Sequence, residues 1–190
     1  SLGVSARRRY PRARSRKKPH ASAKEHIEKI YSGIWKDTKY GVVLWLTTAS
    51  ESYLGNLVES PQGAVPKKLP DGTPSGEVRG IHDAQEANLG TTKEDHPPAA
   101  QPRHRAVARL SLFWEARHPG APQLCAKRDV SRAFKWHTVC PEDVEDFGTR
   151  LPGEPVGVEG DVVIVHCVLT FGWTGSPGEY MVFAWAVKWA

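Results

Sequence analysis

The stretch 161–180, DVVIVHCVLTFGWTGSPGEY, connects the two most apolar segments of this 190-residue chain through a turn of small residues. Residues 161–169 form a nearly unbroken apolar run rich in β-branched side chains, which predicts a buried central strand. Residues 178–190 are apolar nearly all round, which predicts a buried helix. Gly172 and Pro177 interrupt the run between them, and glycine lets a backbone approach a neighbour or a ligand closely. We therefore expect a strand, a tight turn with a close neighbour, and a helix.

The segments before this stretch predict a mixture of short helices and strands. A helix is expected at 22–34, with Ser22 as its N-cap, and either a strand or a short buried helix at 41–48. Turns joining short strands are expected at 61–105, and a helix at 110–117, which ends at His118-Pro119-Gly120. A strand is expected at 124–130, followed by a turn or the start of a helix at 131–137. A short helix is expected to begin at Pro141. Together these elements predict an α+β fold, in which an antiparallel sheet is backed by helices.

Positive charge is concentrated at the start of the chain, although the net charge is only +5. Residues 6–20, ARRRYPRARSRKKPH, hold eight Arg or Lys and no acid, so the rest of the chain is close to neutral. Residues 1–22 offer almost nothing apolar to bury, and we predict that they form a disordered basic arm. Residues 23–64 carry no motif that we recognise and form an upstream segment of uncertain role.

Cysteine usage and hydropathy limit the class of protein. The three cysteines, Cys125, Cys140 and Cys167, are odd in number and widely spaced, which argues against a disulfide framework and fits a reducing compartment. No cysteine or histidine pair has the spacing of a zinc site. The apolar runs are far shorter than the roughly 20 residues that span a bilayer, so we expect no membrane partner. We expect no signal peptide, and because the sequence stops inside a predicted helix we expect it to be a fragment.

Two places in the sequence are candidates for chemistry. Asp129 follows a predicted buried strand, where it is either the N-cap of the next turn or a ligand of Mg²⁺, which prefers carboxylate oxygens. Lys67, Lys68 and Arg79 surround an Asp-Gly turn in a predicted hairpin. That hairpin is either an ordinary solvated surface or a phosphate clamp, since Arg binds phosphate in a fork and Lys as a point charge.

In order along the chain, these blocks resemble the fingers and palm of a reverse transcriptase of the retroviral and long-terminal-repeat retrotransposon type. The basic hairpin leads into IHDAQEAN, and an apolar strand ending in Asp129 is followed by Ala133 and Phe134. The family's glycine-rich motif is matched by Leu169, Phe171, Gly172, Ser176 and Pro177, with Thr170 in place of the usual proline. TVCPEDVEDFGT also resembles the segment that lies between those two motifs. The resemblance covers residues 65–190.

The resemblance implies an RNA-directed DNA polymerase, a nucleotidyltransferase that extends a primer on an RNA or DNA template with deoxynucleoside triphosphates. It implies two Mg²⁺ ions, or Mn²⁺, held by Asp129 and the backbone carbonyl of Val130. Further roles follow for residues around the nucleotide. Lys67 or Lys68 and Arg79 would bind its triphosphate, Phe134 would exclude a 2′-hydroxyl, and Phe171 and Gly172 would lie beneath the primer terminus, whereas Asp83 would be a structural acid of the fingers.

The same resemblance implies an incomplete active site. The family's other catalytic motif carries two consecutive aspartates, and this sequence has no Asp-Asp pair and no aspartate after Asp161. We therefore expect a piece of a larger polyprotein, located in a cytoplasmic particle or the nucleus, without polymerase activity of its own. A non-catalytic protein that binds nucleic acid through the basic arm is the alternative, and an inert copy of a retrotransposon or an unrelated α+β domain stays open.

Overall fold

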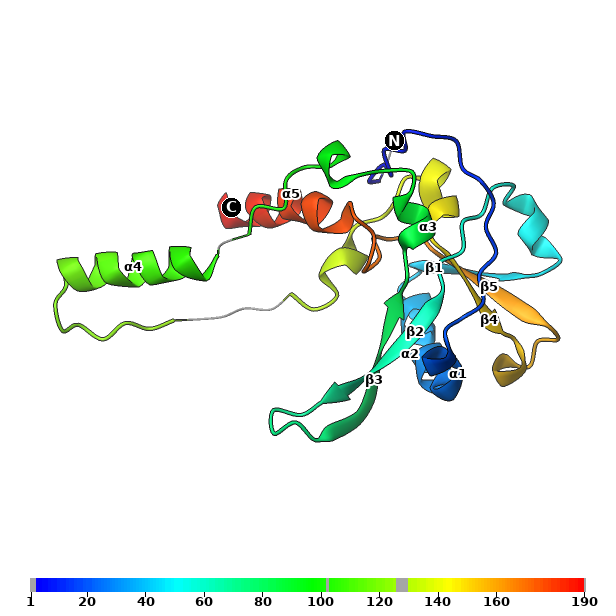
Figure 1. Cartoon of the computed structure of the whole chain (residues 1–190), viewed down its shortest axis with the longest axis horizontal. Helices are drawn as coiled ribbons and strands as arrows, with labels where there is room; N and C mark the ends of the chain where they lie inside the picture. Colours follow the sequence, from blue (N-terminus) through cyan, green and yellow to red (C-terminus); the bar gives the residue numbers. More distant parts are fainter. Residues whose placement is uncertain (1–2, 102, 126–129, 190) are drawn as a thin grey trace.

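The computed structural model describes residues 3–101, 103–125 and 130–189, without the side chains of residues 187–189. The helices are α1 (Ala21–Glu25), α2 (Ile27–Lys39), α3 (Gln85–Asn88), α4 (His104–Arg117) and α5 (Ser176–Trp189). The strands are β1 (Val43–Thr47), β2 (Gln62–Lys68), β3 (Pro74–His82), β4 (Gly148–Pro152) and β5 (Asp161–His166). Short 3₁₀ turns occur at η1 (Ser50–Tyr53), η2 (Lys93–Asp95), η3 (Ala133–Trp136), η4 (Pro141–Asp146) and η5 (Glu154–Val156). The molecule is thus a mixed α and β structure with antiparallel pairing (Figure 1).

The predicted central strand is confirmed. β5 lies between β1 and β4 and pairs antiparallel with both, in the order β1-β5-β4. Because side chains alternate along a strand, Val162 and Ile164 face one side and Val163 and Val165 the other, and all four are at most 3% exposed. The residues between 41 and 48 form strand β1 rather than a helix, and this strand ties the upstream segment 23–64 directly to the last third of the chain.

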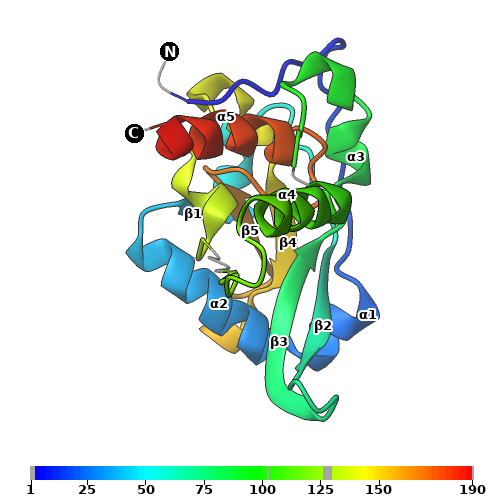
Figure 2. The ribbon, with the colours of Figure 1, turned by 90° about the vertical axis from the view of Figure 1, so that its left-hand side faces the viewer.

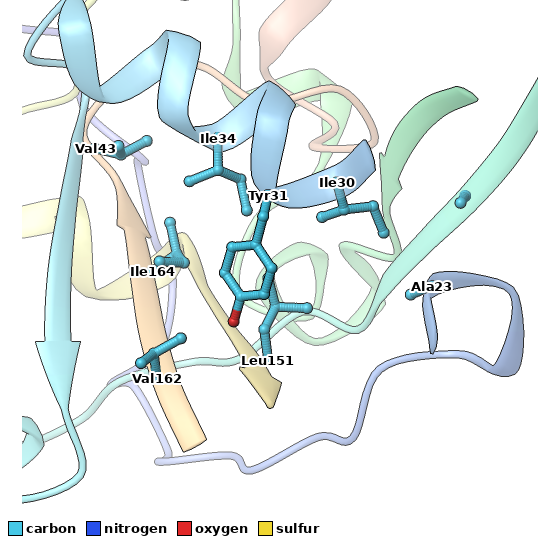
Figure 3. Close-up of a cluster of buried hydrophobic side chains, with 9 residues drawn as sticks. Ala23, Ile30, Tyr31, Ile34, Val43, Leu151, Val162 and Ile164 are labelled. Atoms are coloured by element: carbon cyan, nitrogen blue, oxygen red, sulfur yellow. The ribbon is translucent and has the colours of Figure 1, made fainter. Parts of the chain in front are cut away.

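Helix α2 covers one face of the three-stranded sheet. Ile30, Tyr31 and Ile34 repeat at helical spacing and pack on Leu151 and Ile164, as Figure 3 shows. The predicted helix at 22–34 is interrupted at His26, which caps α2, while Ser22 accepts a hydrogen bond from the backbone N–H of Ala64 instead of capping a helix. The upstream segment is therefore part of the hydrophobic core.

Strands β2 and β3 form the predicted hairpin, separate from the three-stranded sheet. Val65 pairs with Arg79, and the register shifts between Pro66 and Lys68. The hairpin extends away from the body beside α2 (Figure 2). The end of β3 at His82 lies close to the sheet, because the ring of His82 contacts that of His166 at the end of β5.

The expectation of a disordered basic arm is wrong for the residues that the structure describes. Residues 3–20 run over the body in an extended conformation to α1 (Figure 1), and Ala6 is buried. The acids that bind the arm lie on different elements. The ion pairs of its Arg and Lys residues are Arg7 with Glu179, Arg8 and Arg12 with Asp146, Arg12 with Asp143, Arg9 with Asp95, Arg14 and Arg16 with Glu51, and Lys17 with Glu86. Composition alone predicted disorder because the arm has few apolar residues. Its order comes instead from carboxylates elsewhere in the chain that would otherwise be buried without a partner.

Two predictions about burial are also corrected. The helix at the end of the chain begins at Ser176, but Val182, Phe183 and Trp185 are about half exposed, so it is not buried all round. The helix predicted at 110–117 is longer, and no residue of α4 is buried; Figure 1 shows it well apart from the sheet. The strand predicted at 124–130 falls partly on residues 126–129, which lie outside the described residues, and Leu124 is 96% exposed with no strand pairing.

No helix in the described part of the chain is both long enough and apolar enough to cross a bilayer.

Candidate nucleotide-binding site

The glycine-rich turn between β5 and α5 is built against the end of the hairpin. Gly172 has a φ of +94°, and a Cβ at this position would lie 2.6 Å from the backbone carbonyl oxygen of His82. The side chain of Asn88 clamps the turn, because its amide donates to the carbonyl of Gly172 (3.0 Å) and its carbonyl accepts from the N–H of Thr174 (2.8 Å). The close neighbour of Gly172 in the structure is therefore the protein's own backbone, and the contact with a primer terminus that the resemblance implies stays a prediction.

The beginning of α5 is fixed in the same way. The hydroxyl of Ser176 donates to the carbonyl of Thr170 (2.6 Å), and both residues are buried. At Gly178 a Cβ would overlap the carbonyl oxygen of Pro97, so the first turn of α5 crosses that segment in direct backbone contact. The small residues of the motif thus lock the turn and the helix to the segment that follows the hairpin.

A buried histidine, His96, reinforces this contact through its hydrogen bonds. His96 is buried, its Nδ1 lies 2.9 Å from a carboxylate oxygen of Glu179, and its Nε2 lies 2.8 Å from the hydroxyl of Thr91. The ring also packs edge-on against Trp173. Sequence reasoning missed both His96 and Asn88; the quoted segment IHDAQEAN contained the asparagine, but nothing in the spacing assigned it to the turn.

Three of the predicted site residues lie together. The rings of Phe134 and Phe171 are 4.7 Å apart, and Gly172 follows directly. Tyr180 on α5 packs against Phe134 from another direction, at 5.6 Å. Phe171 is 58% exposed, so the pair presents an aromatic surface beside the turn. Val130 is also exposed, four residues before Phe134, whereas Asp129 lies outside the described residues.

The predicted phosphate-binding cations are spread along the hairpin. Arg79 is exposed on β3, three residues from His82, which corresponds to about 10 Å at roughly 3.3 Å per residue. Lys68 pairs with Pro74, eight residues from His82, and therefore lies about 25 Å along the strand from the turn. Lys67 is exposed as well and forms an ion pair with Glu77 (2.7 Å). In this conformation the hairpin brings Arg79 toward the turn and holds both lysines away from it.

Carboxylates do not gather beside the turn within the described ranges. No group of three or more His, Cys, Asp or Glu in them is placed to hold a metal ion. Asp83 lies 3.5 Å from the ring of His20 on the arm, and its carboxylate accepts from the backbone of Gln85. The residues described around the turn therefore do not by themselves form a magnesium site.

Comparison with known proteins finds a similar fold among solved structures. No protein-family model matches the chain, and no curated protein matches it. Among solved structures, the fold is similar to that of a reverse-transcriptase-containing polypeptide. The match is the crystal structure of a mutant of the prototype foamy virus protease–reverse transcriptase, with a TM-score of 0.58 and 18% sequence identity. It covers 98% of this chain and 20% of that chain, so this chain spans about a fifth of the length of the structure it matches.

The extent of this likeness goes beyond the resemblance found in the sequence. The motifs covered residues 65–190, whereas the structural match takes in nearly the whole chain, including the upstream segment and the basic arm. The common feature is the fold, a mixed α and β arrangement like a segment of that reverse transcriptase. The pairing of β1 with β5 gives the physical reason, because the central strand cannot bury its edge without the upstream segment.

Proposed function

We propose that this chain is a fingers–palm segment of an RNA-directed DNA polymerase of the retroviral or retrotransposon type. The observation that carries the proposal is the locked glycine-rich turn. The sequence motif that resembles the family's motif forms one structural unit with the hairpin, through Gly172 and His82, in a chain whose fold is similar to that of a protease–reverse transcriptase. Neither the motif nor the fold alone would carry it.

Each predicted residue has a role in the proposal. The exposed aromatic surface of Phe134 and Phe171 supports contact with the sugar or base of a nucleotide. Arg79 carries the triphosphate contact, because it lies nearest the turn among the three hairpin cations. Lys67 and Lys68 then serve the nucleic-acid backbone farther out on the hairpin, or reach the nucleotide only if the hairpin moves.

The metal ions belong to the proposal for the complete enzyme. Mg²⁺ or Mn²⁺ would be bound by Asp129 and the carbonyl of Val130, and would activate the primer hydroxyl and neutralise the triphosphate. This chain supplies only one of the carboxylates that such a pair of ions requires, because it has no Asp-Asp pair. We therefore propose that the 190 residues bind a primer–template and do not extend it.

The alternative, a protein that binds nucleic acid chiefly through the basic arm, is less favoured by the contacts of the arm. Arg8 and Arg12 are engaged with Asp146, and Arg14 with Glu51, and both acids are 1% exposed. A phosphate would have to replace buried carboxylates that lose their partners, at a cost of several kcal/mol each. Lys18 has no ion pair among the described residues and stays available, but a single lysine gives little affinity.

Binding of a fluorescent primer–template to the 190-residue chain tests the proposal. We expect anisotropy to show salt-dependent binding, weakened about fivefold by Lys68→Gln on the hairpin and unchanged by Lys24→Gln, which removes an exposed cation on α1. Primer extension with deoxynucleotides should be absent in the same samples. The proposal fails if Lys68→Gln and Lys24→Gln behave alike, and extension of the primer would overturn the expected inactivity.

A further inference from the structure

A small pocket between α2 and the hairpin contains an unusual buried group. It measures about 130 Å³ and is lined by the polar residues Lys29, Asp37, Gln62, His82, Lys135 and His166, together with Ile30, Gly33, Ile34, Val78 and Gly80. His166 lines this pocket, and its buried Nε2 has no hydrogen-bond partner among the described residues; the residue is only 3% exposed. A buried polar atom of this kind calls for a partner, and the pocket is where one would lie.

The two imidazoles of the pocket are neutral. The rings of His82 and His166 meet edge to face with their centroids 4.5 Å apart. Burial lowers the pKa of His82 to about 4 and the pKa of His166 well below its usual value, with Lys135 and, for His166, the neighbouring ring acting in the same direction. A neutral imidazole nitrogen can donate or accept one hydrogen bond, so the inner pocket suits a neutral polar group.

A second, more open part of the same groove is basic. It measures about 260 Å³, is lined by Lys29, Lys36 and Lys67, and shares Lys29, Gly33 and Val78 with the inner pocket. The carboxylate of Glu77 already lies here. Lys67 binds it at 2.7 Å, and Lys67 and then Lys36 lower its pKa. Three lysines and one carboxylate leave a net charge of +2, which matches the roughly −2 charge of a phosphate monoester.

A glycine inside helix α2, Gly33, also points to a ligand in this groove. It lies in the middle of α2, where glycine is unfavourable relative to alanine. A Cβ at this position would have no heavy atom within 4 Å, so the packing of the protein does not require the glycine. Gly33 lines both parts of the groove, and its missing side chain leaves the helix backbone open to a ligand.

We propose that this groove binds a small phosphate monoester that carries a neutral, hydrogen-bonding head. The phosphate lies among Lys29, Lys36 and Lys67, where it displaces the carboxylate of Glu77. The head enters the inner pocket and supplies the hydrogen bond that Nε2 of His166 lacks. This site is distinct from the glycine-rich turn, and the inference does not rest on the function proposed above.

Calorimetric titration with three probes identifies the head. Adenosine 5′-monophosphate, ribose 5-phosphate and inorganic phosphate share the anion and differ in the head, a base with its sugar, a sugar, or none. We expect one of the two esters to bind at least tenfold more tightly than inorganic phosphate, and to shift the imidazole ¹⁵N signals of His166 and His82 in NMR spectra. The tighter ester shows whether the head is a heterocycle or a sugar. Equal affinity for all three probes, or unchanged histidine signals, would refute the placement of the head.

Two substitutions in the basic part of the groove should change the affinity for the ester in opposite directions. Lys36→Gln should weaken binding of the tighter ester about fivefold, whereas Glu77→Gln should strengthen it, because the ligand then displaces no competing carboxylate. Lys39→Gln, on the same helix but outside the groove, is the matched control. Gly33→Leu should fold normally and abolish binding, since its side chain points into open space. If Gly33→Leu binds as well as the parent, or Lys36→Gln matches Lys39→Gln, the groove is not the site.

Discussion

Mild acid should destabilise this protein through two neighbouring histidines, the buried His166 and the partly buried His82. A histidine whose pKa is lowered on folding binds more protons in the unfolded chain, so the free energy of unfolding falls as the pH drops through the unfolded value of about 6.5. For His82, with a folded pKa of about 4, the loss between pH 7.5 and pH 5 is about 2 kcal/mol. His166 adds to this loss in the same direction, because its pKa is also lowered.

The groups around the pair do not reverse this sign. The carboxylate of Asp37, which lines the same pocket, is bound by Lys135 and Arg132. Carboxylates with a lowered pKa, such as Glu51 at about 2, lose their contribution only below the unfolded value of roughly 4.5. Between pH 7.5 and pH 5 these carboxylates therefore contribute little, and His137, whose pKa burial also lowers, adds to the loss.

Urea unfolding followed by tryptophan fluorescence at several pH values measures the effect. The parent chain should lose at least 2 kcal/mol over this range, and His82→Gln about 2 kcal/mol less than the parent. His104→Gln, which removes an exposed histidine of α4, should follow the parent curve. A parent chain whose stability is flat between pH 7.5 and pH 5, or a His82→Gln variant that falls in parallel with it, would refute the reasoning.

Two further substitutions test the contacts that hold the fold. Gly172→Ala should lower the free energy of unfolding by about 3 kcal/mol, because the added Cβ meets the His82 carbonyl and the backbone has a positive φ. Gly41→Ala, with a φ of +66° and no neighbour within 4 Å, should lower it by only about 1 kcal/mol. Equal losses in urea unfolding would contradict the close contact. Arg150→Gln should cost about 3–5 kcal/mol, because the buried Glu59 (3.0 Å) loses its ion pair, whereas Glu51 (2.7 Å) keeps Arg14 and Arg16; a loss below 1 kcal/mol would contradict this account.

Local sequence patterns correctly predicted the elements that depend on residues close together in the sequence. The apolar run around Ile164 gave the central strand, and the Asp71-Gly72 pair gave the hairpin turn, since both depend on residues close in sequence. The prediction of a disordered arm failed because the contacts of the arm are with residues far away in the sequence. Arg12 is held by Asp143 and Asp146, more than 130 residues away, and no local composition reveals such complementarity.

The same distinction applies to the candidate site: residues in the local motif were predicted, and residues whose role depends on distant contacts were missed. The spacing of the motif identified Phe171 and Gly172, and the structure brings them together with Phe134, 37 and 38 residues earlier. Asn88 and His96 were missed, because their roles depend on how the segment after the hairpin meets the turn. The roles in nucleotide binding stay predictions, and that of Asp129 falls outside the described residues.

The contact between Gly172 and His82 has a mechanical consequence. β3 carries Arg79 and ends at His82, whose carbonyl touches the turn on one side, while Asn88 holds the turn from the segment that follows. A rigid-body movement of the hairpin that carries α3 with it therefore cannot leave the turn in place, because both of these contacts would break. If Arg79 closes over a bound nucleotide, the aromatic surface at Phe171 must shift with it. The glycine is then needed for two reasons at one position: it allows the left-handed turn, and it lets the hairpin backbone bear directly on the turn without an intervening side chain.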